Sequence, residues 1–255
     1  MEITYATRPA SDDVPNDDYV LAAETWAVML DGATAPAGVD SGCIHDVPWL
    51  TAHLATHQAA MLATEPEREL RDVLRESIVR TCVDHTDTCD VTNRDSPSST
   101  SVLARVRAGR FEYAVLGDSG VVIEHADGTV EAIVDDRTSY LPSYTREDVS
   151  LLRNTDQGFW IASIKPEAAD RALTGSLPVD DVARVAVVTD GATRLNERYG
   201  WSWKQLLDRL DEDGPDAVID AVRREDARVP KGVHRGKYPH DDISVLLWRL
   251  AGGAR

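Results

Sequence analysis

The sequence predicts an α+β layered sandwich in which sheets carry helices on their outer faces. Short β-rich runs joined by tight turns indicate an antiparallel, meander-rich sheet, and longer amphipathic runs between them indicate helical hairpins. No internal repeat, low-complexity tract or long linker divides the chain. We therefore expect a single domain over residues 1–255.

The strand predictions rest on composition, alternation and turn signals. Residues 101–107 and 111–116 alternate around Ala108-Gly109-Arg110, which predicts a hairpin. Residues 121–125 and 130–134 flank Asp127-Gly128, a dipeptide typical of short hairpin turns. The other expected strands are residues 3–7, 19–24, 26–30, 185–189 and 243–247.

The helix predictions rest on apolar residues at helical spacing. We expect helices at residues 49–62, 66–82, 203–210 and 216–222. Residues 86–99 are polar and turn-rich, which predicts a loop between a helix and a strand. The final A-G-G-A-R predicts a frayed end.

Composition and charge limit the partners. The chain has 255 residues and is 42% hydrophobic, enough for a real core. The net charge of −17 repels phosphate backbones, so we expect no nucleic-acid partner. No apolar window is long enough to span a bilayer, so we expect no membrane partner. The acidic surface indicates either solubility in a crowded or salty cytosol or carboxylates that converge on a cation.

The cysteines and the first residues bear on the compartment. The opening M-E-I-T-Y-A-T lacks the basic and apolar regions of a secretory signal. Cys43, Cys82 and Cys89 cannot all pair within the chain, which predicts reduced thiols in the cytoplasm. Cys82 and Cys89 lie too far apart for a Cys-x-x-Cys motif and bring no histidine cluster with zinc spacing, so we expect no cysteine metal site.

Acidic residues stand at the ends of the expected strands. They are Asp17 and Asp18, Asp31, Asp118, Asp190, and Asp241 with Asp242. A carboxylate at the end of an apolar strand costs free energy unless it is solvated, hydrogen-bonded or bound to a cation. If these strand ends lie side by side, the clustered charges are stable only around a cation. Oxygen donors favour Mg²⁺ or Mn²⁺.

Two of these strands run into the same tetrapeptide, D-G-A-T, at Asp31 and at Asp190. A glycine after the aspartate lets the backbone turn sharply and can bring a carbonyl oxygen to an ion. Asp-Gly is also an ordinary turn sequence. Asp-Gly occurs after two strands, and acidic residues stand at several other strand ends. This pattern favours a role as metal ligands over a role as ordinary turn residues.

The acidic residues lie in motifs with a definite order along the chain. The motifs are N-D-D-Y at residues 16–19, L-D-G-A-T at 30–34, S-S-T-S-V at 98–102, V-L-G-D-S-G at 115–120, V-V-T-D-G at 187–191 and H-D-D-I-S at 240–244. This ordered set resembles the metal-dependent protein phosphatases (PPM), the type 2C serine/threonine family. It looks most like the small, stand-alone actinobacterial members, and it covers residues from about 16 to 250.

The resemblance implies a four-layer α/β/β/α sandwich with two central, mostly antiparallel sheets and a site at one edge. It implies two ions, Mn²⁺ or Mg²⁺, that share a bridging water. By position, Asp31 would bridge both ions, and the Gly32 carbonyl and Asp17 would hold one of them.

The same resemblance assigns the remaining acidic residues. Asp190 and Asp241 would hold the other ion, and Asp18 would orient metal-bound water. In some bacterial members the residue matching Asp118 helps to hold a third, weaker ion. The implied catalytic residues are thus Asp31, Asp190 and Asp18. The implied mechanism is in-line attack of a metal-bridging hydroxide on phosphorus. The sequence agrees in lacking a Cys-x5-Arg loop and a Gly-x-Ser-x-Gly elbow.

The chain departs from the family pattern where phosphate would bind. Members often carry an arginine four residues before the first acidic ligand, but this chain has Asp13 there. Arg8 lies nearby and is the candidate substitute for binding substrate phosphate. Arg194 stands four residues after Asp190, where members with a third metal often have aspartate. It either argues against a tight third site or supplies the missing phosphate contact.

Other departures leave alternatives open. Asp242 replaces the usual asparagine, and Ser98 replaces the usual glycine. His45 is either a general acid for the leaving group or a packing residue at a helix start, the second being favoured. His240 is expected to orient its neighbouring ligand. The basic run K-G-V-H-R-G-K at residues 231–237 is either a rim that attracts a phosphorylated substrate or a solvated loop.

The predicted function is hydrolysis of phosphoserine and phosphothreonine monoesters, with a phosphorylated protein as the substrate. The first alternative is a small-molecule phosphatase of the same fold acting on a small phosphoester, with residues 135–159 shaping its substrate choice. The second is a non-catalytic binding module of the same fold. The sequence does not predict the oligomeric state.

Overall fold

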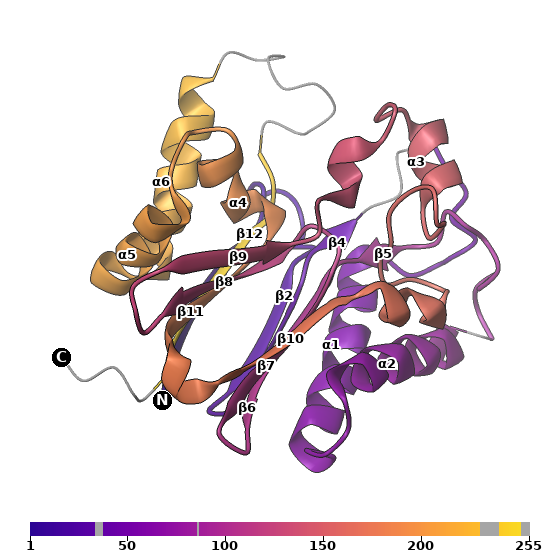
Figure 1. The fold of residues 1–255 in the computed structure, drawn as a ribbon. Helices are drawn as coiled ribbons and strands as arrows, with labels where there is room; N and C mark the ends of the chain where they lie inside the picture. Colours follow the sequence, from indigo (N-terminus) through magenta and orange to yellow (C-terminus); the bar gives the residue numbers. More distant parts are fainter. Residues whose placement is uncertain (34–37, 86, 230–239, 251–255) are drawn as a thin grey trace.

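The structure is a computed structural model that describes residues 1–33, 38–85, 87–229 and 240–250. Two five-stranded antiparallel sheets lie face to face at its centre (Figure 1). The first sheet runs in the order β1 (Glu2–Arg8), β12 (Ile243–Arg249), β11 (Val182–Val188), β8 (Gly120–His125), β9 (Val130–Val134). The second runs β10 (Leu173–Pro178), β7 (Arg110–Leu116), β6 (Ser101–Arg107), β3 (Trp26–Leu30), β2 (Tyr19–Ala23). A short pair joins β4 (Gly32–Ala33) to β5 (Ser98–Ser99).

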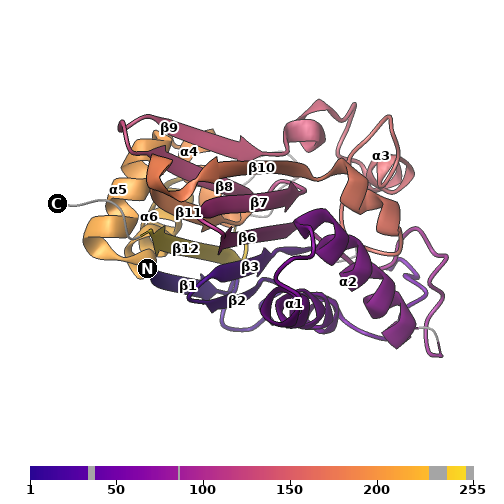
Figure 2. The same ribbon diagram turned by 60° about the horizontal axis from the view of Figure 1, so that its bottom comes forward.

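Helices cover the outer face of each sheet (Figure 2). Helices α1 (Val47–Thr64) and α2 (Leu70–His85) lie on the second sheet. Helices α4 (Asp190–Glu197), α5 (Trp203–Asp213) and α6 (Pro215–Arg228) lie on the first. The remaining elements are α3 (Arg146–Leu152) and the 3-10 helices η1 (Asp136–Tyr140), η2 (Pro166–Arg171) and η3 (Val179–Asp181). The layers therefore follow the predicted α/β/β/α order.

Three apolar cores hold the layers together. Leu54 and Leu74 are fully buried between the α1–α2 pair and the second sheet. Met29 and Trp248 are fully buried between the two sheets. Leu206 belongs to the third core, between the first sheet and its helices. Burial of each large apolar side chain stabilises the fold by about 1.5–3 kcal/mol, which fixes the sheets as a rigid frame for their loops.

Local chemistry explains several element boundaries. Ala108 and Gly109 have φ of 48° and 73°, the left-handed pair that a tight β6–β7 hairpin requires. Asp46 caps α1 by accepting a hydrogen bond from the Trp49 backbone N–H at 2.9 Å. Ser202 and Gln205 form a capping box that starts α5.

Several elements differ from the sequence prediction: α3, the short β4–β5 pair and the 3-10 helices were not predicted, and three further differences have a local explanation. Helix α2 begins at Leu70 because Arg68 N–H closes a turn onto the Glu65 carbonyl, so residues 66–69 are not helical. Strand β10 was not predicted, since L-T-G-S-L-P reads as a turn and its edge position leaves four of its six residues exposed. Helix α4 was not predicted because its first residues, D-G-A-T, read as a turn. The final A-G-G-A-R and the basic run at residues 231–237 lie outside the described residues.

Within the part of the chain that the structure describes, no helix has both the length and the apolar character needed to cross a membrane.

Candidate functional site

The antiparallel register of the second sheet brings Asp18 and Asp31 together. Tyr19, the first residue of β2, pairs with Leu30, the last residue of β3. Asp18 precedes Tyr19 and Asp31 follows Leu30, so the two aspartates lie at the same edge of the sheet. The β4 strand starts from that edge and marks it in Figure 1.

The register of the first sheet brings Asp190, Asp118 and Asp241 to the corresponding edge. Val188, at the end of β11, pairs with Gly120 at the start of β8 and with Val245 near the start of β12. The segments just beyond these paired residues carry the three aspartates. Convergence of the strand ends, the premise of the sequence prediction, is thus what the backbone shows.

The carboxylates lie close enough to raise one another's pKa values. The pKa of Asp31 is raised well above its ordinary value of 3.8, first because the carboxyl is desolvated and then because of neighbouring negative charges. Those charges belong to Asp18, Asp190, Asp118 and Asp241. The pKa of Asp18 is raised as well, chiefly by burial and further by the charges of Asp242 and Asp190. A cluster of this kind costs free energy until a cation enters it.

Asp18 is the most deeply placed of these residues. It is 4% exposed, and its Oδ2 accepts a hydrogen bond from Thr189 Oγ1 at 3.0 Å. Its Oδ1 is buried and has no hydrogen-bond partner among the described residues. A buried carboxylate oxygen of this kind is a ready acceptor for a metal-bound water.

The Asp31 backbone is fixed by two of the sequence motifs. Thr100 Oγ1 accepts from the Asp31 N–H at 3.0 Å, and the Thr100 N–H donates to the Asp31 carbonyl at 2.9 Å. Ser99 Oγ donates to the same carbonyl at 3.0 Å. Ser119, from the G-D-S motif, lies 2.7 Å from Thr100 Oγ1. The motif at 98–102 therefore holds the Asp31 backbone directly. The motif at 115–120 carries Asp118 and also supports Asp31 through the contact of Ser119 with Thr100.

Ser98 adopts strand geometry in β5, where it pairs with Ala33. Its position therefore does not require glycine, which accounts for the departure noted in the sequence.

Glycines allow two close approaches at the site. A Cβ on Gly32 would lie 2.2 Å from Val47 Cγ1 and 2.7 Å from the Asp17 carbonyl oxygen. A Cβ on Gly191 would lie 2.0 Å from the Asp242 carbonyl oxygen. Only glycine therefore lets the segment after Asp31 touch Asp17, and only glycine lets the start of α4 touch the turn before β12.

Asp242 clamps the loop that carries Asp17. Its Oδ1 accepts from the Ala10 N–H at 2.6 Å, and its Oδ2 accepts from the Asp17 N–H at 2.7 Å. Two backbone donors are satisfied by a charged acceptor, which is a strong arrangement. The carboxylate that Asp242 adds in place of the usual asparagine thus accepts hydrogen bonds from the backbone of a neighbouring loop.

We expect Asp242→Ala to weaken Mn²⁺ binding by about 10–100-fold, as loss of an orienting partner does. Two partly buried N–H groups lose their acceptor, so the free energy of unfolding should fall by about 1–3 kcal/mol. Isothermal titration with Mn²⁺ and urea unfolding measure the two effects. Asp216→Ala is the matched control, because Asp216 is 68% exposed at the start of α6. Wild-type Mn²⁺ affinity in Asp242→Ala would refute the clamp.

Arg194 lies inside the protein. Its side chain is 1% exposed and forms ion pairs with Asp241 and, at 3.5 Å, with Asp226, whose side chain is 2% exposed. The guanidinium therefore compensates one buried carboxylate, Asp226, and also pairs with an expected metal ligand, Asp241, whose side chain is 34% exposed. Of the two readings that the sequence left for Arg194, this position favours a cation that opposes a third metal over a phosphate contact.

Arg8 lies at the surface at the end of β1, opposite Ile243. Its side chain is 54% exposed and pairs with Asp216 at 2.5 Å. An exposed pair of this kind contributes little and exchanges readily. Arg8 is thus at the correct edge of the sheet, although the structure directs it toward α6.

Sequence reasoning missed two residues of α6 that border the cluster. Arg223 Nη2 donates to the carbonyls of Pro9 and Asp241, at 2.8 Å each. Asp226 is the buried partner of Arg194 described above. Both lie in a charged run, V-R-R-E-D-A-R, that reads as a solvated helix face, so no local signal distinguishes them.

The structure also places three further residues that the sequence analysis named. Asp118 Oδ2 accepts from Thr138 Oγ1 at 3.4 Å. His240 is half exposed, and its Nδ1 lies 4.0 Å from Asp226 Oδ2. His45 stacks on Trp49 with ring centroids 4.0 Å apart, which agrees with the packing interpretation.

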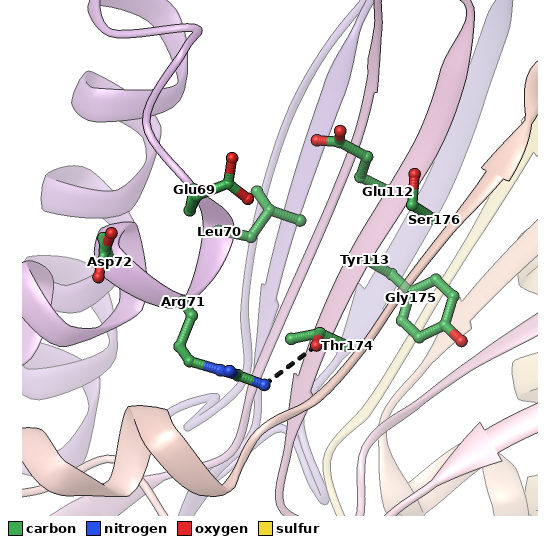
Figure 3. A pocket seen from close by; sticks show the side chains of 9 residues that line it. All are labelled: Glu69, Leu70, Arg71, Asp72, Glu112, Tyr113, Thr174, Gly175 and Ser176. Atoms are coloured by element: carbon green, nitrogen blue, oxygen red, sulfur yellow. Dashed lines mark hydrogen bonds between the residues drawn. The ribbon is translucent and has the colours of Figure 1, made fainter.

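A hollow of about 440 Å³ lies elsewhere, between the start of α2 and strands β7 and β10 (Figure 3). Its lining includes Arg71, which donates to Thr174 Oγ1 at 3.1 Å, and Glu112. None of the expected metal ligands lines it. The hollow is therefore separate from the carboxylate cluster.

Comparisons with known proteins agree with this architecture. Residues 7–223 match the family described as protein phosphatase 2C. The PPM Ser/Thr phosphatase MsPP from Mycobacterium smegmatis, solved with cacodylate, is similar at 16% identity and TM-score 0.61, covering 98% of this chain and 99% of its own. Stp1 from Staphylococcus aureus is similar at 13% identity and TM-score 0.66, covering 98% and 95%.

The catalytic domain of PstP, solved with two manganese ions, is similar at 14% identity and TM-score 0.59, covering 96% of each chain. At these identities the structural likenesses show the fold alone. No curated protein matches the sequence.

Proposed function

Because the chain belongs to the protein phosphatase 2C family, we propose that it hydrolyses phosphoserine and phosphothreonine monoesters using Mn²⁺ or Mg²⁺. The observation that carries this proposal is the convergence of carboxylates from both sheets around Asp31. This site combines hard oxygen donors with a net negative charge that the Arg194–Asp241 ion pair offsets only in part. Such a donor set fits Mg²⁺ or Mn²⁺ and disfavours softer ions.

We assign two ions to the cluster. Asp31 would bridge them, with the Gly32 carbonyl and Asp17 on one ion and Asp190 and Asp241 on the other. Asp118 is the candidate ligand of a third, weaker ion. Bound ions would supply a hydroxide nucleophile at neutral pH and neutralise the phosphoryl oxygens.

The protein's own contribution is to hold the donors in place. Thr100 and Ser99 fix the backbone that presents Asp31, and Asp242 fixes the backbone of Asp17. Asp18 is held by Thr189 with one oxygen free of protein donors among the described residues, so it can accept a hydrogen bond from water and orient it. Preorganised contacts of this kind need no rearrangement during the reaction.

For substrate phosphate we propose Arg8. It is the exposed arginine at the end of β1, on the site edge, and its surface pair with Asp216 is easily broken. Arg194 is better explained as a buried counter-charge, which agrees with its 1% exposure.

The test is phosphate release from a phosphothreonine peptide and from p-nitrophenyl phosphate, with Mn²⁺, with Mg²⁺ and with EDTA. We expect turnover of both substrates that needs metal and is lost in EDTA. Turnover of the small ester alone would favour a small-molecule phosphatase. No turnover with either metal, with Mn²⁺ binding retained, would favour a non-catalytic module.

A further inference from the structure

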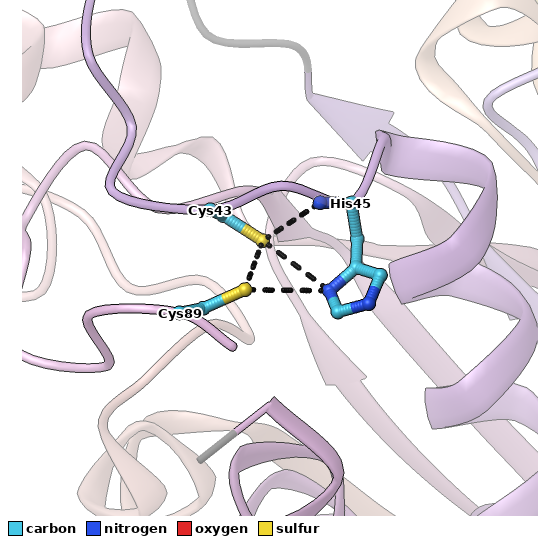
Figure 4. A group of neighbouring side chains, drawn as sticks. All are labelled: Cys43, His45 and Cys89. Carbon is cyan, nitrogen blue, oxygen red and sulfur yellow. Dashed lines mark hydrogen bonds between the residues drawn. The ribbon is translucent and has the colours of Figure 1, made fainter. Parts of the chain in front are cut away.

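Two cysteines and a histidine converge beside the start of α1, away from the carboxylates described above. Cys89 Sγ lies 3.2 Å from Cys43 Sγ, and His45 Nδ1 lies 3.3 Å from Cys89 Sγ and 3.7 Å from Cys43 Sγ. Figure 4 shows all three ligand atoms turned toward one point. The residues come from two loops, and each is half-buried.

The spacing of these atoms suits a tetrahedral metal ion. A point equidistant from the three atoms lies about 2 Å from each, close to the usual Zn–S and Zn–N distances of about 2.3 and 2.0 Å. An ion placed slightly out of their plane therefore reaches all three. The fourth position of a tetrahedron would be left to water, since the group is half-buried.

Backbone donors also prepare the sulfurs for negative charge. The Ile44 N–H donates to Cys89 Sγ, and the His45 N–H donates to Cys43 Sγ, each at 3.4 Å. Burial and the hydrogen bond with Cys89 raise the pKa of Cys43 to about 11 in the metal-free protein. Burial also opposes ionisation of Cys89, but hydrogen bonds from Thr88, Cys43 and the backbone lower the pKa of Cys89, which makes Cys89 the first of the two thiols to ionise. A thiolate is the form that binds metal.

The ring of His45 is held in the orientation that faces both sulfurs. It stacks on Trp49 and lies 5.1 Å from the ring of His85, which is 4% exposed. A disulfide between Cys43 and Cys89 would need no such histidine, so the third converging atom favours a metal ion over a sulfur–sulfur bond.

We propose that Cys43, His45 and Cys89 form a binding site for a soft divalent cation of the Zn²⁺ class, separate from the Mn²⁺/Mg²⁺ centre. Thiolate and imidazole donors select such ions, as carboxylates select hard ones. Binding requires both thiols to ionise, so it releases two protons and weakens as pH falls. Sequence reasoning compared Cys89 with Cys82 and therefore expected no cysteine metal site, whereas in the fold the spatial partner of Cys89 is Cys43, 46 residues earlier in the chain.

The ion would clamp two loops that lead directly to the carboxylate cluster. Asp90 N–H donates to the Gly42 carbonyl at 2.8 Å, and Asn93 Nδ2 donates to the Asp40 carbonyl at 3.0 Å. The first loop precedes α1, and Val47 of α1 contacts Gly32. The second leads into Ser98–Ser99, which pairs with Gly32–Ala33. The bound ion therefore stabilises the support of the proposed active site.

A second group of potential metal ligands joins α1 to α2. His53 and His57 of α1 each lie 2.8 Å from Asp84 Oδ2 of α2. This arrangement is explained by hydrogen bonds that join the two helices. It nevertheless provides an alternative metal site that the experiment must distinguish.

The test uses the full chain, reduced and freed of metal, in excess Mg²⁺ to saturate the carboxylates. Co²⁺ is added as a spectroscopic probe, and Zn²⁺ affinity is measured by competition with a chromophoric chelator. We expect one equivalent of Co²⁺ with thiolate-to-cobalt charge-transfer absorption, displaced by Zn²⁺. Cys43→Ser and Cys89→Ser should each lose that absorption and bind Zn²⁺ more than about 100-fold more weakly, since even indirect changes near a metal cost about 10–100-fold.

Two controls make the result specific. Cys82→Ser should behave as wild type, because the Cys82 thiol contacts the Ser163 carbonyl instead of the cluster. The double variant His53→Gln/His57→Gln should also keep the charge-transfer band. Circular dichroism checks that each variant is folded. The proposal is overturned if wild type shows no thiolate–cobalt band, if Cys43→Ser keeps it, or if the reduced protein binds no Zn²⁺ and forms a Cys43–Cys89 disulfide on mild oxidation.

Discussion

Replacing Asp31 with asparagine should abolish metal-dependent phosphatase activity while making the metal-free protein more stable. Asp31 is assigned to bridge both ions, so its loss should lower phosphate release by at least about 1,000-fold, the upper end of what one lost transition-state contact costs. Asparagine keeps the shape of the side chain and removes one negative charge from the cluster. The two effects have opposite signs, which a merely structural role cannot produce.

The stability gain follows from the raised pKa of Asp31. In the metal-free protein, burial and the surrounding carboxylates favour the protonated form of Asp31 in the folded state. This contribution to stability is fully present below the ordinary pKa of 3.8 and is lost as pH rises through the higher folded value. At neutral pH a carboxyl at this position therefore lowers the stability of the metal-free fold relative to a neutral amide, and Asp31→Asn removes that penalty.

Thermal unfolding in EDTA at several pH values measures this gain. We expect a higher Tm for Asp31→Asn at neutral pH, about 2–4 °C for each kcal/mol relieved. The difference from wild type should shrink as the pH is lowered toward the ordinary carboxyl pKa. Asp220→Asn, an exposed position on α6, is the matched control. Near-normal turnover, or a lower Tm in EDTA at neutral pH, would contradict the assignment of Asp31.

The layered sandwich and the clustering of acidic strand ends follow from short-range signals in the sequence, whereas the four-layer α/β/β/α order was implied by the resemblance to the phosphatase family. Alternation predicts β6 and β7, and the apolar run before Asp31 predicts β3, because central strands are buried on both faces. In an antiparallel sheet every second chain reversal lies at the same edge. Acidic residues at the corresponding strand ends therefore predict one cluster. These features depend on periods of a few residues, which a single sequence displays directly.

The features that sequence reasoning missed depend on contacts between distant segments. From the sequence, Arg194 either opposes a third metal or contacts phosphate, and only the packing of α4 against α6 shows that it is buried beside Asp226. Cys43 and Cys89 have no spacing that suggests a shared site, because the fold brings their loops together. Asp242 appears only as an added charge until its two backbone donors are seen.

Arg194→Met should lower the free energy of unfolding by about 3–5 kcal/mol, the cost of breaking a buried ion pair by removing one partner. Methionine fills much of the same volume, but Asp226, 2% exposed, loses the guanidinium charge that faces it. Tyr199 Oη still donates to Asp226 at 2.5 Å, which compensates only part of that loss. Urea unfolding in EDTA measures the effect.

The same variant separates a buried counter-charge from a phosphate ligand. If Arg194 bound substrate, Arg194→Met would raise KM with little change in stability. If Arg194 is a counter-charge, Arg194→Met should lower the free energy of unfolding. Adding Asp226→Leu should then recover part of the loss, because the double variant no longer buries an unpaired carboxylate at position 226. Arg8→Met provides the contrast: its exposed pair with Asp216 contributes at most about 1 kcal/mol, so stability should hold while KM rises. A stable Arg194→Met protein with raised KM would reverse the roles that we give to these two arginines.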